Sequence, residues 1–315
     1  MSIHRLPIPT PWAVGRVNCY LVEDDPLTLV DTGPNSGVAL DELERGLAEH
    51  GRRVEDLERI VLTHHHPDHE GLIGVLKRRS GAEVCALDRM TDWLGDWQGQ
   101  MKLDDAHAAD LMRRHGVAPD TVTVLEAMAQ GFRAWGASAA VDTPLTDGGT
   151  LAFANRTWTV HHRPGHSSTD TVFHDHERRE AIGGDHLLAH ISSNPLASKD
   201  QATPLLNYLR SLRTTQATED LDTVLPGHGD TVTDPRALVE TRLKMHERRA
   251  RKIGAMLDSG PMSAHEIART MWGSAAITQT FLTISEVLGH IDILLERGEV
   301  QAVEADGLTR FARTG

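Results

Sequence analysis

The sequence predicts an α/β protein in which sheets and helices are stacked in layers. Over the first 230 residues, short apolar runs of β character alternate with amphipathic helical segments, an order typical of layered α/β folds. The chain of 315 residues is also long enough for one large or two ordinary domains with a substantial core. We expect a main domain over residues 1–235 and a small, mostly helical domain over residues 236–315.

The first half of the main domain is expected to alternate between strands and helices. Two apolar runs on either side of the acidic, proline-containing turn Glu23–Pro26 predict a hairpin. Apolar residues at helical spacing from Val38 predict a helix that ends near Gly51. The expected elements of this half are 17–22, 27–30, 38–50, 60–62, 72–79 and 82–87.

Residues 88–135 interrupt this pattern with a helical insertion. The segment has helical propensity and contains Trp93, Trp97 and Trp135. It could form the lid or wall of a substrate pocket, or an ordinary helical cover over the sheet.

The β pattern resumes after the insertion. Strands are expected within Val141–Val160, at Ala181–Asp185 and at Val224–Pro226. The segment Phe173–Glu180 is expected to be a polar loop, in which His174 and His176 belong either to a solvated hairpin or to a second metal site. The adjacent His161 and His162 are expected to be structural, because neighbours on a strand cannot both face one site.

The segment after residue 235 is expected to be helical and to end in a hairpin. A helix is predicted over 236–258, and capping-type patterns precede two further helices at 263–268 and 284–296. Apolar runs at 300–303 and 308–311 flank a turn and predict the hairpin. Helices followed by a hairpin resemble a winged helix.

The motif Thr63-His64-His65-His66-Pro67-Asp68-His69 follows the expected strand at 60–62. On an extended segment His64 and His66 face the same side, so both could bind one metal ion. Asp68 and His69 would lie on the first turn of a helix after Pro67 and point toward a second position. Imidazoles and carboxylates are the ligands that borderline-soft divalent metals prefer. The alternative is a solvated polar loop with Asp68 as the helix cap.

The pattern His-x-His-x-Asp-His resembles the signature of the metallo-β-lactamase superfamily. Further residues match that family in order: Asp31 in Asp-Thr-Gly, His166 in Pro-Gly-His, Asp185 in Gly-Gly-Asp and His228 in Pro-Gly-His-Gly. The resemblance covers about residues 14–230, and it is greatest to the glyoxalase-II-like hydrolases because no cysteine replaces a ligand. It implies an αββα sandwich of two similar halves, with the metal ions at one edge between the sheets.

The resemblance also implies a set of roles for these side chains. One divalent ion would be held by His64, His66 and His166, a second by Asp68, His69 and His228, and Asp185 would bridge them. The ions would be zinc, with iron and manganese as alternatives. They would share a hydroxide that attacks a carbonyl and that Asp68 could orient. Behind these ligands, Asp31 would orient a ligand histidine. His186 could donate a proton and Tyr208 could stabilise an oxyanion, unless His186 and Tyr208 are core residues.

Charge favours a small acyl substrate over a nucleic acid. The net charge is −13, and the first 235 residues carry 35 acidic against 21 basic side chains, which repels phosphate backbones. A thioester or related ester is therefore the expected substrate. A lactone comes next, then a β-lactamase-like amide, and a phosphodiester or RNA last. A different class of function would make the basic run Arg242–Lys252 the DNA-binding part of a ligand-sensing regulator.

The composition predicts a soluble, cytoplasmic protein. Apolar content is 39%, charged content is 24%, and no stretch reaches the length of a membrane span. The first residues lack a secretory signal, and the two cysteines, Cys19 and Cys85, cannot form a disulfide framework. The C-terminal unit is expected to form a wall of the acyl pocket or to mediate a homodimer.

Overall fold

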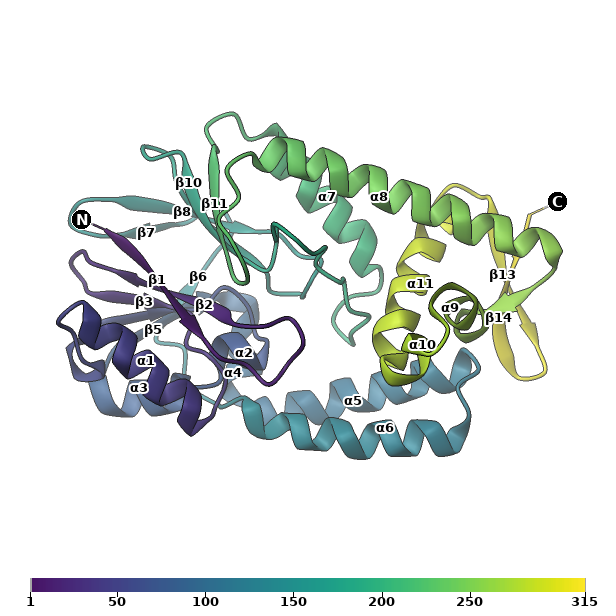
Figure 1. Cartoon of the computed structure of the whole chain (residues 1–315), viewed down its shortest axis with the longest axis horizontal. Coiled ribbons are helices and arrows are strands. Elements are labelled where there is room, and N and C mark those ends of the chain that lie inside the picture. The colour runs from purple at the N-terminus through teal and green to yellow at the C-terminus, as the bar shows by residue number, and fades with distance from the viewer. Residues whose placement is uncertain (1, 315) are drawn as a thin grey trace.

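The computed structural model describes residues 2–314 and places the strands of the main domain in two facing sheets (Figure 1). The first sheet has the order β1-β2-β3-β4-β5-β6, with antiparallel pairs as far as β3 and parallel pairs after it. Its strands are β1 Ile3–Ile8, β2 Val17–Val22, β3 Thr28–Val30, β4 Arg59–Val61, β5 Glu83–Leu87 and β6 Thr143–Leu145.

The second sheet has the order β11-β10-β9-β8-β7, in which only β10 and β11 are parallel. Its strands are β7 Thr150–Ala152, β8 Thr157–His162, β9 Thr171–Asp175, β10 Glu180–Gly184 and β11 Thr223–Pro226. One apolar core joins buried residues of both sheets, such as Leu29 and Ile60 of the first and Trp158 and Phe173 of the second. The core therefore lies between the sheets.

Helices cover the outer faces of this sandwich. On the first sheet, α1 (Gly37–Glu49) starts at Ser36, whose hydroxyl accepts from the amide of Ala39 at 3.1 Å, and ends before Gly51 at φ +69°. The short α2 (Pro67–Glu70) and α3 (Ile73–Ser80) follow the histidine motif. On the second sheet lies α7 (Pro204–Ala217). The predicted αββα sandwich is thus confirmed.

The segment Phe173–Glu180 was expected to be a loop, and this expectation is wrong for its first half. Strand β9 continues through Asp175, and His174 is buried. The polar residues of this segment suggested a loop, but they belong to a strand whose alternate side chains face different surroundings. Phe173 packs between the sheets, while Val172 and His174 lie on the outer face near α7.

The insertion forms α4 (Thr91–Gly95), α5 (Trp97–Arg114) and α6 (Pro119–Phe132). Helices α5 and α6 pack together and extend from the sandwich to the C-terminal part of the chain (Figure 1). At that end the ring of His115 stacks on Phe311, with ring centroids 5.7 Å apart. The insertion therefore connects the sandwich with the C-terminal part.

The C-terminal part contains four helices and a small sheet within the described residues. The helices are α8 Pro235–Met256, α9 Ala264–Trp272, α10 Ala275–Thr278 and α11 Thr280–Glu296. The sheet has the order β12-β14-β13, with β12 Met262–Ser263, β13 Val300–Ala305 and β14 Leu308–Arg313. The predicted hairpin and helices are present.

One of the two predicted helix starts is confirmed and the other is wrong. Ser263 and Glu266 form a reciprocal capping box at the start of α9. The other helix was expected over 284–296, but α11 begins earlier, at Thr280. The hydroxyl of Thr283, just before the expected start, donates to the carbonyl of Gln279 at 3.1 Å, so it bonds within the first turn of α11 and does not cap a helix.

The C-terminal helices share a core with α7. Leu205 and Tyr208 of α7 belong to the same buried cluster as Ile253 of α8 and Ile291 of α11. A methyl group on Gly289 of α11 would approach Leu205 Cβ to 2.7 Å, so the two helices are in close contact. The division at residues 235 and 236 falls at the start of α8, and it stays a prediction. Across residues 2–314, no helix combines the length and apolar character needed to cross a membrane.

Candidate metal centre

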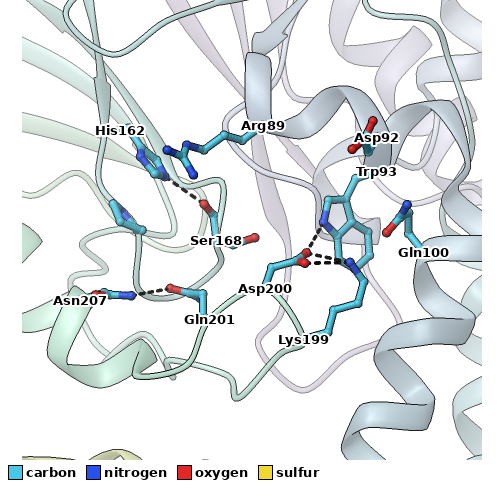
Figure 2. A pocket seen from close by; sticks show the side chains of 11 residues that line it. Arg89, Asp92, Trp93, Gln100, His162, Ser168, Lys199, Asp200, Gln201 and Asn207 are labelled. Carbon is cyan, nitrogen blue, oxygen red and sulfur yellow. Dashed lines mark hydrogen bonds and ion pairs between the residues drawn. The ribbon is translucent and has the colours of Figure 1, made fainter.

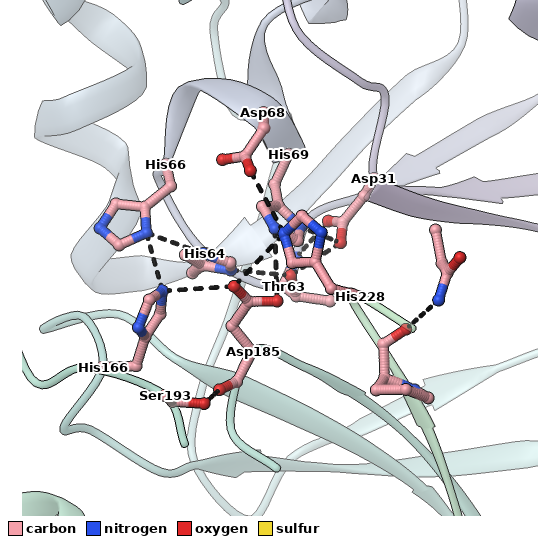
Figure 3. Close-up of polar contacts among 12 residues, drawn as sticks. Asp31, Thr63, His64, His66, Asp68, His69, His166, Asp185, Ser193 and His228 are labelled. Carbon is pink, nitrogen blue, oxygen red and sulfur yellow. Dashed lines mark hydrogen bonds and ion pairs between the residues drawn. The ribbon is translucent and has the colours of Figure 1, made fainter. Parts of the chain in front are cut away.

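The candidate ligands follow the ends of strands at one edge of the sandwich (Figure 3). Asp31 follows β3, and the motif that begins at Thr63 follows β4, which is parallel to β3. On the other sheet Asp185 and His228 follow the parallel strands β10 and β11. Parallel strands bring these ends together, because their carboxyl ends lie at the same edge of a sheet.

The first group of ligands consists of His64, His66 and His166. His64 Nε2 lies 3.1 Å from His66 Nδ1, which lies 2.9 Å from His166 Nε2. The rings meet edge to face, with centroids 4.6 Å apart for both pairs. Three imidazole nitrogens converging in this way suit one divalent ion.

The second group consists of Asp68, His69 and His228. His228 Nε2 lies 3.3 Å from Asp68 Oδ2, and one atom from each residue lies within 4.8 Å of the others. Asp68 and His69 are on α2, where Pro67 takes the first helical position. This is the placement that the sequence predicted.

Asp185 lies between the two groups. Its Oδ2 is 3.5 Å from both His166 Nε2 and His228 Nε2, and its Oδ1 is 3.5 Å from His69 Nε2. Both Asp185 Oδ1 and His69 Nε2 are buried without a hydrogen-bond partner. Such atoms are costly unless a cation or another polar partner satisfies them, so the residues fit bound metal ions.

The other nitrogen of several rings is held by a polar partner away from the centre. Asp31 accepts from His69 Nδ1 at 2.8 Å and from the amide and hydroxyl of Thr63, both also at 2.8 Å. The carbonyl of Arg16 accepts from His228 Nδ1 at 2.8 Å, and that of Asn194 from His166 Nδ1 at 3.2 Å. Each contact holds Nδ1 away from the centre, so that Nε2 faces the other candidate ligands.

Burial and charge set the protonation of these groups. Burial and the neighbouring histidines lower the pKa of His64 and His66 well below the usual value, so both rings are neutral, as metal ligands must be. Burial lowers the pKa of His69, but the carboxylates of Asp31, Asp185 and Asp68 outweigh burial and raise that pKa to about 10. Burial likewise opposes the effect of His69 and His228 on Asp68, whose pKa lies below its usual value. The second group therefore attracts positive charge.

Two glycines allow the ligands to come this close. A methyl group on Gly227 would lie 2.2 Å from Asp185 Oδ1 and 2.7 Å from His69 Cε1. One on Gly165 would lie 2.4 Å from Tyr208 Cα. Only glycine fits at either position, which explains why a glycine precedes both His228 and His166.

Three further residues of the sequence analysis lie outside the ligand cluster. His65 turns away from His64 and His66, stacks on Trp93 with centroids 4.0 Å apart, and contacts Thr169 Oγ1 at 2.7 Å. His186 Nε2 contacts Thr215 Oγ1 of α7 at 2.8 Å, and Tyr208 donates to the His186 carbonyl at 2.9 Å. Both side chains are buried in the core, and the suggested roles of His186 as proton donor and Tyr208 as oxyanion donor stay predictions.

Sequence reasoning missed Arg16, Asn194 and Ser193. Ser193 donates to the carbonyl of Asp185, and the other two accept from ligand histidines through their carbonyls. Carbonyls carry no residue signature, so no sequence signal could have found these two.

A polar cavity of about 450 Å³ lies beside the loop that carries His166 (Figure 2). Pro164 and Ser168 of that loop line it, together with Trp93 of the insertion, and none of the candidate ligands does. Lys199 lies over Trp93 with its ammonium 4.8 Å from the ring centroid, and Asp200 accepts from Trp93 Nε1 at 2.9 Å. The insertion thus forms a wall of this cavity, while its role as the lid or wall of a substrate pocket stays a prediction.

Two facing sheets with helices outside, and a His/Asp cluster at their common edge, define a metal-binding αββα sandwich. Comparison with known proteins agrees: the chain belongs to the metallo-beta-lactamase superfamily, whose family model matches residues 12–228. It is 34% identical to "Probable metallo-hydrolase YqjP" of Bacillus subtilis (strain 168), over 98% of this chain and 96% of that protein.

Two solved structures resemble the whole chain, including its C-terminal part. The metallo-beta-lactamase family protein TTHA1429 from Thermus thermophilus has a TM-score of 0.85 and 28% identity, over 99% of this chain and 98% of that one. A beta-lactamase domain protein from Burkholderia ambifaria also has a TM-score of 0.85, with 26% identity over 100% of this chain and 93% of that one.

Proposed function

We propose that this protein is a metal-dependent hydrolase with two divalent ions, and that it cleaves a small acyl substrate, a thioester or related ester. The observation that carries the proposal is the position of Asp185, 3.5 Å from His166 of one ligand group and from His69 and His228 of the other. One carboxylate can face two cations because it has two oxygens. The relative YqjP, named a probable metallo-hydrolase, supports the general class.

Two bound divalent ions would supply a nucleophile at neutral pH and polarise a carbonyl. The residues of this protein would hold the two ions and orient the reacting groups. His64, His66 and His166 form the first site, and Asp68, His69 and His228 form the second. Asp31 keeps His69 oriented through its hydrogen bond to Nδ1. Asp68 is ionised and could orient an attacking water by accepting a hydrogen bond from it.

Apolar side chains on segments connected to the candidate centre support an acyl substrate. The loop from Trp12 to Arg16, whose last carbonyl holds His228, brings Trp12 against Phe132 and Trp135. Two further apolar side chains, Ile191 and Leu282, are 47% and 39% exposed. The carbonyl of Leu282 accepts from the side chain of Asn194, whose own carbonyl accepts from His166. Such apolar surroundings suit a substrate with an uncharged acyl group better than a polyanion.

Contacts of the C-terminal basic run disfavour the DNA-binding alternative. Lys244 pairs with Glu240 at 2.5 Å, and Arg249 and Arg251 pair with Glu286 and Glu247. Arg242 donates to the carbonyls of Leu188, Ala189 and Ile191. These four cations thus have partners within the protein. We propose that the C-terminal part, winged-helix-like in its order of helices and hairpin, forms a wall of the acyl site. A glyoxalase-II-like acyl hydrolase fits this arrangement.

The test is a substrate panel run with metal-analysed protein. Thioesters, a lactone, a cephalosporin and a phosphodiester would be compared by kcat/KM. We expect close to two metal ions per chain and the highest kcat/KM for a thioester or ester. Full activity with one ion or fewer would overturn the two-ion mechanism. Preference for the lactone, the cephalosporin or the phosphodiester would overturn the proposed substrate class, and salt-dependent DNA retention would favour the regulator.

A further inference from the structure

A second histidine cluster lies on the outer face of the second sheet, away from the candidate metal centre. Thr159 of β8 is paired directly with His174 of β9, and His161 is paired with Val172. Because side chains alternate along a strand, Thr159, His161 and His174 lie on one face. The ring centroids of His161 and His174 are 6.0 Å apart, and those of His174 and His176 are 4.0 Å apart.

The hydrogen bonds of this cluster leave ring nitrogens free for a ligand. His174 Nε2 lies 3.0 Å from the carbonyl of Asp220, to which it must donate, so its Nδ1 is bare. His176 Nδ1 donates to the Asp220 carboxylate at 2.6 Å, and Nε2 then accepts from the Thr159 hydroxyl at 2.9 Å, a rotor that can turn away. A carboxylate or carbonyl behind a ligand histidine is the usual support of a metal site.

From this geometry we propose that His161, His174 and His176 form a further binding site for a divalent transition metal ion, supported by Asp220. One ring nitrogen from each of the three residues lies within 4.8 Å of the others. Three imidazoles suit zinc, nickel or copper rather than calcium or magnesium. The site is open to solvent, since the side chain of His176 is 48% exposed and His161 is half-buried.

The surroundings are compatible with a bound cation. Burial, followed by the charge of Arg163, lowers the pKa of His161 to about 4, and burial also lowers the pKa of His174, so both rings are neutral at pH 7. Arg163 opposes a cation, while the carboxylates of Asp220 and Asp147 favour it. Because Asp220 lies between α7 and β11, the ion would tie the β8–β9 hairpin to the segment that leads into β11.

The experiment compares nickel uptake by variants of the full-length protein. Each protein is first loaded with zinc and freed of excess ion, then titrated with Ni²⁺, and total bound zinc and nickel are measured by elemental analysis, because the proposed site can hold either ion. His161→Ala and His176→Ala remove ligands from exposed or half-buried positions, so folding should be kept. His107→Ala, on α5, is the matched control because it removes one histidine elsewhere.

We expect wild type and His107→Ala to bind one more metal ion per chain, zinc or nickel, than His161→Ala or His176→Ala. Asp220→Asn should keep the site but weaken it about 10- to 100-fold. Filling this site should raise the Tm of wild type, and the same treatment should not raise that of the two ligand variants. Equal total metal binding by all five proteins would overturn the proposal. The outcome is independent of the substrate, because none of these residues belongs to the candidate metal centre.

Discussion

The two sheets contribute to the candidate metal centre in different ways. The first sheet supplies His64, His66, Asp68 and His69 from one continuous segment, in which the strand exit and the first turn of α2 set the geometry. The second sheet supplies His166, Asp185 and His228 from three separate strand ends. The first half is thus determined locally, and the second depends on how the strands are packed.

This difference predicts different sensitivities in the two halves. In the first half, replacing a ligand should remove a metal contact while leaving the backbone in place. In the second half, small changes of backbone position are enough to misplace Asp185 or His228, because Gly227 leaves no spare room beside them.

The largest effect is expected for Asp68→Ala in the first half. The change removes a candidate ligand and the proposed partner of the attacking water, so kcat should fall roughly 10²- to 10⁴-fold. The first group keeps His64, His66 and His166, so about one metal ion per chain should remain. Steady-state kinetics and elemental analysis measure both quantities. Near-native kcat would show that the second group takes no part in the reaction.

Gly227→Ala tests the second half without touching any ligand. The new methyl group would approach Asp185 Oδ1 to 2.2 Å, and a displacement of about 1 Å at the site can cost about 100-fold in kcat/KM. Gly37→Ala in α1 is the control, since a methyl group there would have no neighbour within 4 Å. If Gly227→Ala and Gly37→Ala had the same kcat/KM, the tight packing around Asp185 would not matter for activity.

Asp31→Asn tests the support of the first half. Asparagine keeps the size of the side chain and tolerates the left-handed backbone at φ 58°, but it removes the charge behind His69. Affinity for one metal ion should fall about 10- to 100-fold, with little change in Tm once metal is saturating. Metal titration with a competing chelator gives the affinity. An unchanged affinity would show that the charge of Asp31 does not support metal binding.

His65→Ala should have the smallest effect on the reaction, although the residue lies inside the motif. Its ring is buried against Trp93, so the loss should be in stability, about 2 kcal/mol. Alternation along the strand turns His65 away from His64 and His66, so we expect metal binding to be kept and stability to fall. Denaturant unfolding and metal content measure the two; lost metal with unchanged stability would contradict this assignment.

The layered fold and the first ligand group could be predicted from the sequence because both depend on neighbouring residues. Strand and helix periodicity extends over a few positions, and His64 to His69 are joined by one strand exit and one turn. The capping box at Ser263 is equally local and was found. Thr283 shows the limit, because a hydroxyl can cap a helix or bond inside one, and the surrounding packing decides which.

Only the tertiary structure decided how the distant residues meet. The pairing of β10 with β11 brings Asp185 beside His228, and carbonyls of Arg16 and Asn194 hold two ligand histidines from loops remote in sequence. The same holds for His161, His174 and His176, which strand register places on one face. The sequence alone determined which residues can bind metal. Their arrangement follows from sheet register and core packing, which are long-range interactions that no short motif encodes.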